Sequence, residues 1–270
     1  MNSLTNQNFT EISKRYRETS IIQNSVADIL FALLDIKDRE SVLDVGCGTG
    51  NLTKKILDKS HGYVVGIDPS QGMINESSKL YKDGINFQLG SAESIPFENI
   101  FDVIFCNSAF QWVTDAQKAV RNFYKALKSD GRIGIQAPAR QDYCPNFVLA
   151  VDALKKHETL GRTFKHFTSP WFFLNSSAEY TSLFQQQGFK VPFCEIQTIE
   201  TLHTPEEVFK IFASGAIAGY LNKAYYECEI SDDYIRDFQN FIRLEFERQT
   251  HDDGRVSLVF NRIFLIGVKE

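Results

Sequence analysis

One short stretch, Val42 to Gly50, limits most strongly what this chain can fold into. Its apolar half, Val42 to Val45, is typical of a buried strand, and three alternate glycines then lead to a helix start at Asn51. Glycine lets the backbone turn sharply and approach a ligand closely, and the first N–H groups of a helix have no partner inside it. The stretch therefore predicts a cofactor-binding turn at the carboxyl end of a strand.

The spacing of the glycines separates two kinds of cofactor. A dinucleotide site has the pattern G-x-G-x-x-G, which sets a helix N-terminus against a pyrophosphate. This chain instead has D-x-G-x-G-x-G, from Asp44 to Gly50. A carboxylate at Asp44 would repel a pyrophosphate, but it would attract a cationic ligand.

A second acid follows at the end of the next apolar run. The segment Tyr63 to Ile67 predicts a strand that ends at Asp68. Asp68 comes about 20 positions after Gly46, the separation at which a strand-end carboxylate binds ribose hydroxyls in nucleotide-binding sheets. An aspartate before a proline is also a common helix cap, but its pairing with the glycine turn favours the ribose role.

Apolar runs and helical patterns alternate along the first half of the chain. Further strands are predicted at Ile85 to Leu89, Phe101 to Cys106 and Arg132 to Ala137, and a helix at Ala116 to Lys128. We expect Gly131 to form the turn between that helix and the last of these strands. The alternation predicts an α/β, Rossmann-like fold with a mostly parallel sheet and helices on both faces.

The alternation lapses from Pro138 onward. A proline at the first helical position predicts that a helix begins at Thr204-Pro205. The other expected elements are helices at Asn146 to Leu160, Ser176 to Gln187 and Asp232 to Gln249, an aromatic-rich loop or lid at Gly161 to Phe173, a strand within Lys190 to Glu200, and terminal strand material at Arg255 to Val268.

Composition excludes several classes of protein. A net charge of -5 gives no basic field for nucleic acid. Five cysteines without a C-x-x-C pair argue against a disulfide framework and a zinc site, and no cluster has metal-ligand spacing. The first ten residues lack a signal design, and no run approaches the roughly 20 apolar residues of a membrane span. We expect a cytoplasmic protein with no membrane and no nucleic-acid partner.

These motifs resemble those of the class I S-adenosylmethionine-dependent methyltransferases, whose first motif has the form of Val42 to Gly50. The pattern F-D-x-I…N-x-x-x-Q-W-V, from Phe101 to Val113, is similar to that of the trans-aconitate and malonyl-thioester methyltransferases. The resemblance implies S-adenosylmethionine as cofactor, which carries an ammonium and a sulfonium. It also implies a seven-stranded sheet, completed by a final antiparallel hairpin, and a helical substrate cap inserted in the C-terminal half.

On this resemblance the whole chain is one methyltransferase domain. The expected parts are N-terminal helices over the cofactor at 1–36, a cofactor-binding core at 37–138, cap insertions at 139–175 and 201–254, and the completing helix and strands at 176–200 and 255–270.

The motifs and the resemblance together give a set of candidate cofactor residues. Ser91 stands where relatives commonly have an acid that binds the adenine amino group, so that contact is either weaker here or shared with Glu93. Tyr16, and Gln23 near it, match positions ahead of the first motif that fold over the cofactor. The full set is Tyr16, Asp44, Gly46, Cys47, Gly48, Gly50, Asp68, Pro69, Met73, Ser91, Ala92, Glu93, Asn107 and Ala109.

Candidate residues on the acceptor side are fewer, and the sequence identifies no catalytic residue. Arg140, Arg162, Lys165 and His166 could form a cationic face for an acid, or they could be solvated surface charges. The aromatic residues near Trp171 could line a pocket or pack as a core. The acceptor-side candidates are Phe110, Trp112, Arg162, His166 and Trp171.

The predicted function is methyl transfer to a small or medium-sized organic acceptor, most favourably a carboxylate oxygen, by in-line displacement. Two alternatives stay open. One is a small-molecule C-methyltransferase, which would require a general base, and the other is a non-catalytic regulatory module that binds the same cofactor. The sequence does not indicate an oligomeric state.

Overall fold

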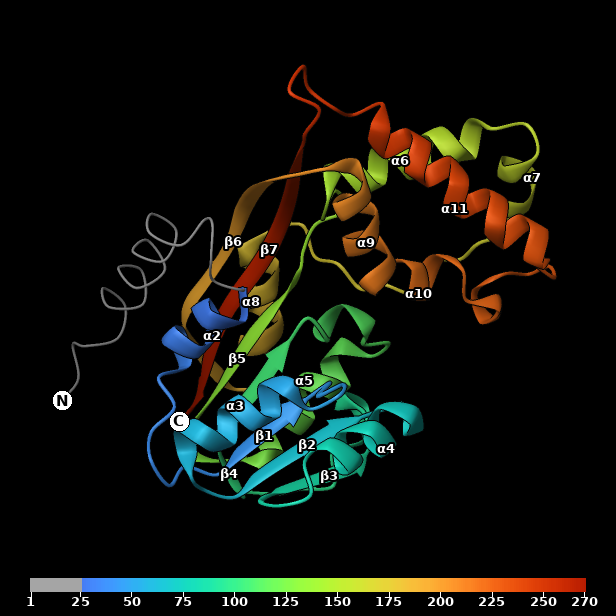
Figure 1. Cartoon of the computed structure of the whole chain (residues 1–270). Coiled ribbons are helices and arrows are strands. Elements are labelled where there is room, and N and C mark those ends of the chain that lie inside the picture. Colours follow the sequence, from blue (N-terminus) through green and yellow to red (C-terminus); the bar gives the residue numbers. More distant parts are fainter. Residues whose placement is uncertain (1–25) are drawn as a thin grey trace. The chain divides into compact units, whose positions relative to one another are not determined.

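Buried apolar runs form the parallel part of one seven-stranded sheet in the computed structural model, which describes residues 26–270 (Figure 1). Each segment predicted from an apolar run forms a strand, and the runs at Val42 to Val45 and Val64 to Ile67 are almost completely buried. Val42 pairs in parallel with Val64 on one side and with Val103 on the other. The parallel strands are β1 (Val42–Val45), β2 (Val64–Asp68), β3 (Ile85–Leu89), β4 (Phe101–Asn107) and β5 (Leu127–Pro138).

Two long strands from the second half of the chain complete the sheet. They are β6 (Phe189–His203) and β7 (Val256–Lys269), and the strand order is β3-β2-β1-β4-β5-β7-β6. β7 runs antiparallel to β5, with Gly134 opposite Ile266. The terminal strand material expected at Arg255 to Val268 forms this single antiparallel strand. The predicted fold class, a mostly parallel seven-stranded α/β sheet, is confirmed.

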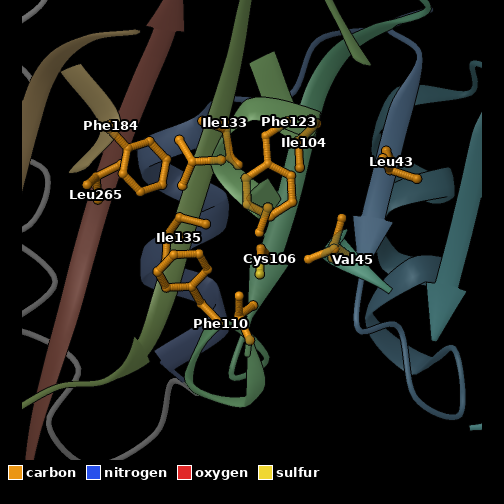
Figure 2. Close-up of a cluster of buried hydrophobic side chains, with 14 of the residues drawn as sticks. Leu43, Val45, Ile104, Cys106, Phe110, Phe123, Ile133, Ile135, Phe184 and Leu265 are labelled. Carbon is orange, nitrogen blue, oxygen red and sulfur yellow. The ribbon is translucent and has the colours of Figure 1, made fainter. Parts of the chain in front are cut away.

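Helices cover both faces of the sheet. Phe123 and Phe184 pack on one face against alternate residues of β5 and β7, as Figure 2 shows. On the opposite face Phe31 stacks on Phe105, with ring centroids 4.8 Å apart. The helices around the sheet are α2 (Val26–Leu34), α3 (Asn51–Ser60), α4 (Gln71–Leu80), α5 (Ala116–Ala126) and α8 (Ser177–Gln185), with the short 3-10 turns η1 (Ala92–Ser94) and η2 (Phe110–Trp112).

The turn between α5 and β5 differs from the prediction. β5 begins at Leu127, directly after the helix, and its pairing with β4 is interrupted between Phe101 and Val103. Asp130, and not Gly131, takes the left-handed conformation, with φ of 61°. Gly131 is instead placed where a Cβ would lie 2.8 Å from the carbonyl oxygen of Lys128. Its lack of a side chain therefore serves close packing rather than a left-handed turn.

The described chain divides into two compact units. The first holds the described residues up to Ala139 together with Phe172–Gln197 and Arg262–Glu270, and the second holds Arg140–Trp171 and Thr198–Asn261. As predicted, Thr204 caps a helix that starts with Pro205. The helices of the second unit are α6 (Pro145–Lys156), α7 (Leu160–Phe164), α9 (Pro205–Gly215), α10 (Ile217–Tyr220) and α11 (Asp232–Glu247), with the 3-10 turn η3 (Lys223–Tyr225).

Aromatic side chains form the core of the second unit. Phe147 packs edge-on against Phe212 at 5.0 Å between ring centroids, and Tyr220 lies 5.7 Å from Phe212. The loop expected from Gly161 is partly wrong, because Leu160–Phe164 forms α7. The ring of His157 explains the break after α6, since its Nδ1 accepts hydrogen bonds from the N–H groups of Thr159 and Leu160 at 3.3 Å.

Tyr16 and Gln23 lie outside the described residues, as does most of the expected N-terminal segment 1–36. Within residues 26–270, every helix is too short or too polar to cross a membrane.

Candidate functional site

The glycine turn after β1 has a backbone conformation that glycine adopts readily. Gly46, Gly48 and Gly50 have φ angles of 78°, 54° and 85°, all in the left-handed region. A Cβ on Gly46 would lie 2.3 Å from the Cβ of Ala109, which follows β4. A Cβ on Gly50 would lie 2.8 Å from the ring of Phe87. The missing side chains therefore allow the turn to pack closely against two neighbours, the segment that follows β4 and the strand β3.

Asp44 lies in β1 directly before this turn and is 2% exposed. Its Oδ2 accepts a hydrogen bond from Oγ1 of Thr53 in α3, at 2.6 Å. The pKa of Asp44 is raised to about 7, mainly by burial; the hydrogen bond from Thr53 lowers it, and the charge of Asp68 raises it. A cationic group bound nearby would favour the ionised carboxylate.

Asp68 joins two loops at the carboxyl end of β2. Its Oδ2 accepts from the backbone N–H of Gly48 at 3.0 Å, and its Oδ1 accepts from the backbone N–H of Ser70 at 2.8 Å. Each carboxylate oxygen has a second lone-pair direction, so Asp68 can accept further hydrogen bonds from a ligand. Ser70 in turn caps α4, with its hydroxyl accepting from the N–H of Met73 at 3.4 Å.

The segment after β3 is fixed by its own serines and by the neighbouring loop. Ser91 caps η1, and its hydroxyl lies 3.2 Å from that of Ser94. Glu93 accepts hydrogen bonds from the backbone N–H and the hydroxyl of Thr114, at 2.8 and 3.1 Å. The side chain of Glu93 therefore joins the loop after β3 to the loop after β4.

A tight turn follows β4. Ser108 has a φ of 54°, an uncommon value for a residue other than glycine, and its backbone N–H donates to the carbonyl of Gln136. Its own carbonyl accepts from Nε2 of Gln111 at 2.8 Å. These bonds hold the left-handed serine at the carboxyl end of β4, which is where open α/β sheets bind ligands.

These segments enclose a cavity of about 280 Å³ in the first unit. Its charged side chains are the acids Asp68 and Glu93, and among the described residues that line it there is no Arg, Lys or His. The lining residues are Val45, Gly46, Asp68, Pro69, Ser70, Met73, Gly90, Ser91, Ala92, Glu93, Cys106, Ser108, Ala109, Trp112 and Val113. The charge of this wall suits a cationic ligand and opposes an anionic one.

The structure brings together nine of the residues predicted from the sequence at this wall: Gly46, Asp68, Pro69, Met73, Ser91, Ala92, Glu93, Ala109 and Trp112. Ser108 lies within the segment from Asn107 to Trp112 that was expected to line the crevice, and five other lining residues were missed, namely Val45, Ser70, Gly90, Cys106 and Val113. Val45 ends a strand and Gly90 comes directly after one, and that position in the sequence was the signal that could have identified these two residues.

Other candidates lie behind the wall. Phe110 is 1% exposed and packs edge-on against Phe172 at 5.8 Å between ring centroids, so the structure places it in the core (Figure 2). Cys47 is buried in the glycine turn. Burial raises the pKa of its thiol, as do the charges of Asp44 and Asp68. Burial and the charge of Asp44 likewise raise the pKa of the Cys106 thiol. Neither thiol is therefore suited to act as a nucleophile. Asn107 ends β4, and Gly48 and Gly50 complete the turn.

The acceptor-side candidates of the second unit have partners of their own. Arg162 has a side chain that is 73% exposed and pairs with Glu158 at 3.0 Å. Arg140 pairs with Asp142 at 3.0 Å, and Nδ1 of His166 lies 4.0 Å from Glu227. His203 likewise has a carboxylate nearby, with Glu207 at 3.9 Å.

Trp171 belongs to the aromatic core of the second unit. Its ring lies edge-on to Tyr220 at 4.7 Å between centroids, and it lies against the backbone at Gly219, where a Cβ would be 2.2 Å from Cζ2. Gly219 therefore leaves the space that the indole fills. Among residues 26–270, no three His, Cys, Asp or Glu side chains gather as a metal site would require.

Comparison with known proteins identifies relatives of part of the chain. Residues 43–135 match the family model described as a methyltransferase domain. A malonyl-[acyl-carrier protein] O-methyltransferase of Acetivibrio thermocellus is 33% identical over 127 residues, which cover 46% of this chain and 45% of the relative. A trans-aconitate 2-methyltransferase of Deinococcus radiodurans is 25% identical over 148 residues, or 54% of this chain and 57% of the relative. The chain thus spans about half the length of these curated relatives.

Among solved structures, the YcgJ protein of Bacillus subtilis is similar over 90% of this chain and 97% of its own, with a TM-score of 0.59 and 21% identity. This similarity shows a shared fold. The residues matched by the family model include the glycine turn, Asp68 and the segment after β4.

Proposed function

We propose, because residues 43–135 match the family model described as a methyltransferase domain, that the chain transfers a methyl group from S-adenosylmethionine to a small or medium-sized organic acceptor. The resemblance to class I methyltransferases, predicted from the motifs, is confirmed by the family match and the relatives. The observation that carries the proposal is the cavity at the carboxyl ends of β1, β2 and β4, whose described wall is acidic.

The residues present fit this cofactor in charge and in shape. Asp68 and Glu93 are the charged groups of the described wall, which favours a ligand with an ammonium and a sulfonium over a pyrophosphate. The position of Gly46 admits no side chain, because a Cβ there would collide with Ala109. At Gly48, by contrast, no atom lies within 4 Å of where a Cβ would be, so a ligand can approach the backbone closely there.

Each part of the wall has a role in this proposal. Asp68 binds the ribose hydroxyls, and Met73 and Ala92 contact the adenine. Asp44, which does not line the cavity, orients the cationic amino-acid end from its buried position before the glycine turn, directly or through water. The cofactor supplies a methyl group on a sulfonium, which is a good leaving group.

The protein then has to align the acceptor and exclude water. Such orientation can contribute roughly 7–11 kcal/mol of the barrier reduction. The segment from Ser108 to Val113, at the end of β4, is positioned to do this because four of its residues line the cavity.

For the acceptor itself we propose a carboxylate oxygen. The names of the relatives support this choice, because malonyl-carrier-protein and trans-aconitate methyltransferases act on acids. A carboxylate is already ionised at pH 7, so it requires no general base. The described wall offers no cation, so the charge of such an acceptor would have to be bound by groups outside this wall.

Calorimetric titration tests the cofactor. S-adenosylmethionine and its demethylated product S-adenosylhomocysteine are expected to bind, and NAD is not. Binding of NAD together with failure of both sulfur compounds would refute the proposal.

Product analysis tests the acceptor. Methyl-labelled S-adenosylmethionine is incubated with a panel of di- and tricarboxylic acids, acyl thioesters of malonate, and carbon acids. A methyl ester releases labelled methanol on mild alkaline treatment, whereas a C-methyl product keeps the label. Alkali-stable label would favour the carbon acceptor, and cofactor binding without turnover on any acceptor would favour a regulatory module.

A further inference from the structure

Glu93 connects two loops that form different parts of the cavity wall. Oε1 accepts from the backbone N–H of Thr114 at 2.8 Å and from its hydroxyl at 3.1 Å, and the N–H of Asp115 lies 3.5 Å away. Glu93 lines the cavity, and so do Trp112 and Val113, which directly precede Thr114. One carboxylate oxygen thus holds the segment after β4 to the segment after β3.

This connection is made by an ionised group. Burial raises the pKa of Glu93, but hydrogen bonds from the backbone of Thr114, from its own backbone and from the hydroxyls of Ser91 and Thr114 together outweigh that effect and lower the pKa. Hydrogen bonds to a charged acceptor are shorter and stronger than those between neutral groups. The link to Thr114 is therefore present throughout the neutral pH range.

Two further hydrogen bonds support the connection between Glu93 and Thr114, one at η1 and one at the start of α5. Nδ2 of Asn122, in α5, donates to the carbonyl of Ala92 at 3.0 Å. Asp115 caps the same helix by accepting from the N–H of Lys118 at 2.9 Å. The residues of η1 are therefore bonded both to α5, at Asn122, and to the residues just before that helix.

We propose that Glu93 is a positioning residue that transmits occupancy of the cofactor cavity to the acceptor-side loop at Trp112 and Val113. This inference rests on the proposed function, because it takes residues 90–93 as part of the cofactor site. When the cavity is filled, the segment after β3 is ordered by its ligand, and Glu93 passes this order to residues 112–115 through Thr114. The acceptor-side loop is thus set before the acceptor is bound.

Hydrogen exchange with S-adenosylhomocysteine as the probe tests this coupling. In the wild-type chain, a saturating concentration is expected to slow amide exchange in peptides covering 90–95 and also in peptides covering 110–116. In Glu93→Ala, saturated at its own affinity, the slowing at 90–95 should persist, and the slowing at 110–116 should fall by at least threefold.

Three further variants separate the loss of the bond between Glu93 and Thr114 from other effects of substitution. Glu93→Gln, which retains a neutral acceptor, is expected to give an intermediate result. Thr114→Val removes one donor outside the cavity wall, so it should weaken the response at 110–116 with cofactor affinity within twofold of wild type. Ser94→Ala removes a hydroxyl of η1 that makes no bond to Thr114, and it should leave that response unchanged.

The outcomes separate the two proposals. Equal slowing at 110–116 in wild type, Glu93→Ala and Thr114→Val would overturn the coupling role of Glu93. Failure of the wild-type chain to bind S-adenosylhomocysteine at all would instead refute the proposed function.

Discussion

The backbone N–H of Gly48 donates a hydrogen bond to Oδ2 of Asp68 across 3.0 Å, which ties the glycine turn after β1 to the end of β2. The other oxygen of Asp68 accepts from the N–H of Ser70 at 2.8 Å. One side chain therefore fixes two loops of the cavity wall while it also faces the cavity. Its role in shaping the site cannot be separated from any direct contact that it makes with a ligand.

Replacement of Asp68 is expected to weaken cofactor binding, and more strongly by alanine than by asparagine. Asp68→Asn keeps one oxygen acceptor but sets an amide NH₂ against the other N–H, and Asp68→Ala removes both acceptors. We expect the dissociation constant for S-adenosylhomocysteine to rise at least tenfold in Asp68→Ala, or about 1.4 kcal/mol, with Asp68→Asn between. Calorimetry measures both, with the exposed Asp58→Ala as control. An unchanged affinity in Asp68→Ala would remove this residue from the site.

The contact between Gly46 and Ala109 gives a test of shape. A Cβ on Gly46 would lie 2.3 Å from Cβ of Ala109, and the φ of 78° disfavours any side chain there. Gly46→Ala should therefore lower both stability and cofactor affinity. In the double variant Gly46→Ala/Ala109→Gly the collision is absent, so part of the loss should be recovered, and the remainder of about 1 kcal/mol reports the backbone strain. If the double variant is no better than the single one, the collision is not the cause.

The central parallel strands could be predicted because they are buried on both faces. Val42 to Val45 has the predicted bounds, since a continuous apolar run is what such a strand requires. Ile85 to Leu89 also has the predicted bounds, although it is an edge strand that alternates apolar and polar residues and is only partly buried. The glycine turn could be predicted because a left-handed backbone favours glycine. Asp68 could be predicted because it ends a strand at the expected separation from that turn. These are local signals that a sequence carries by itself.

The parts that were missed depend on contacts between distant segments. The left-handed backbone of Ser108 is held by the carbonyl of Gln136 in β5, which is distant in sequence, as well as by the amide of Gln111 three residues on. Thr114 gave no functional signal, because its importance arises only when Glu93 reaches it from another loop. In the second unit, α7 was missed because its start depends on the ring of His157.

Arg132 provides a stability prediction outside the site. Its guanidinium donates to the carbonyl oxygens of Leu34 and Asp35 at 2.7 and 3.0 Å and to both carboxylate oxygens of Glu40. A lysine cannot reproduce this planar set of donors. Arg132→Lys is expected to lower the free energy of unfolding by about 1–3 kcal/mol in urea titration, without changing cofactor affinity.

Arg236→Lys is the matched control for Arg132→Lys, because Arg236 is 64% exposed and its pairs with Asp233 and Asp237 lie at the surface. Its effect should stay below about 0.5 kcal/mol. Equal effects of the two substitutions would contradict the anchoring role of Arg132.

Asp44 predicts the pH dependence of stability. Burial raises its pKa from 3.8 to about 7, so between these values the folded chain holds a proton that the unfolded chain has released. The proton on Asp44 therefore adds to the free energy of unfolding at low pH. This contribution falls as the pH rises through the window, by at most about 1.4 kcal/mol per pH unit. Asp44→Asn has no such proton, and its stability should decline less between pH 4 and pH 7.

The comparison of urea titrations for wild type and Asp44→Asn across this range isolates the contribution, because the other carboxyl groups are the same in both chains. The pKa values of Glu93 and Asp102 are lowered, so those groups act with the opposite sign and cancel in the difference. Thr53→Val removes the one hydrogen bond that lowers the pKa of Asp44, and it should extend the window to higher pH. Parallel pH profiles for wild type and Asp44→Asn would show that the buried carboxyl titrates at its ordinary value.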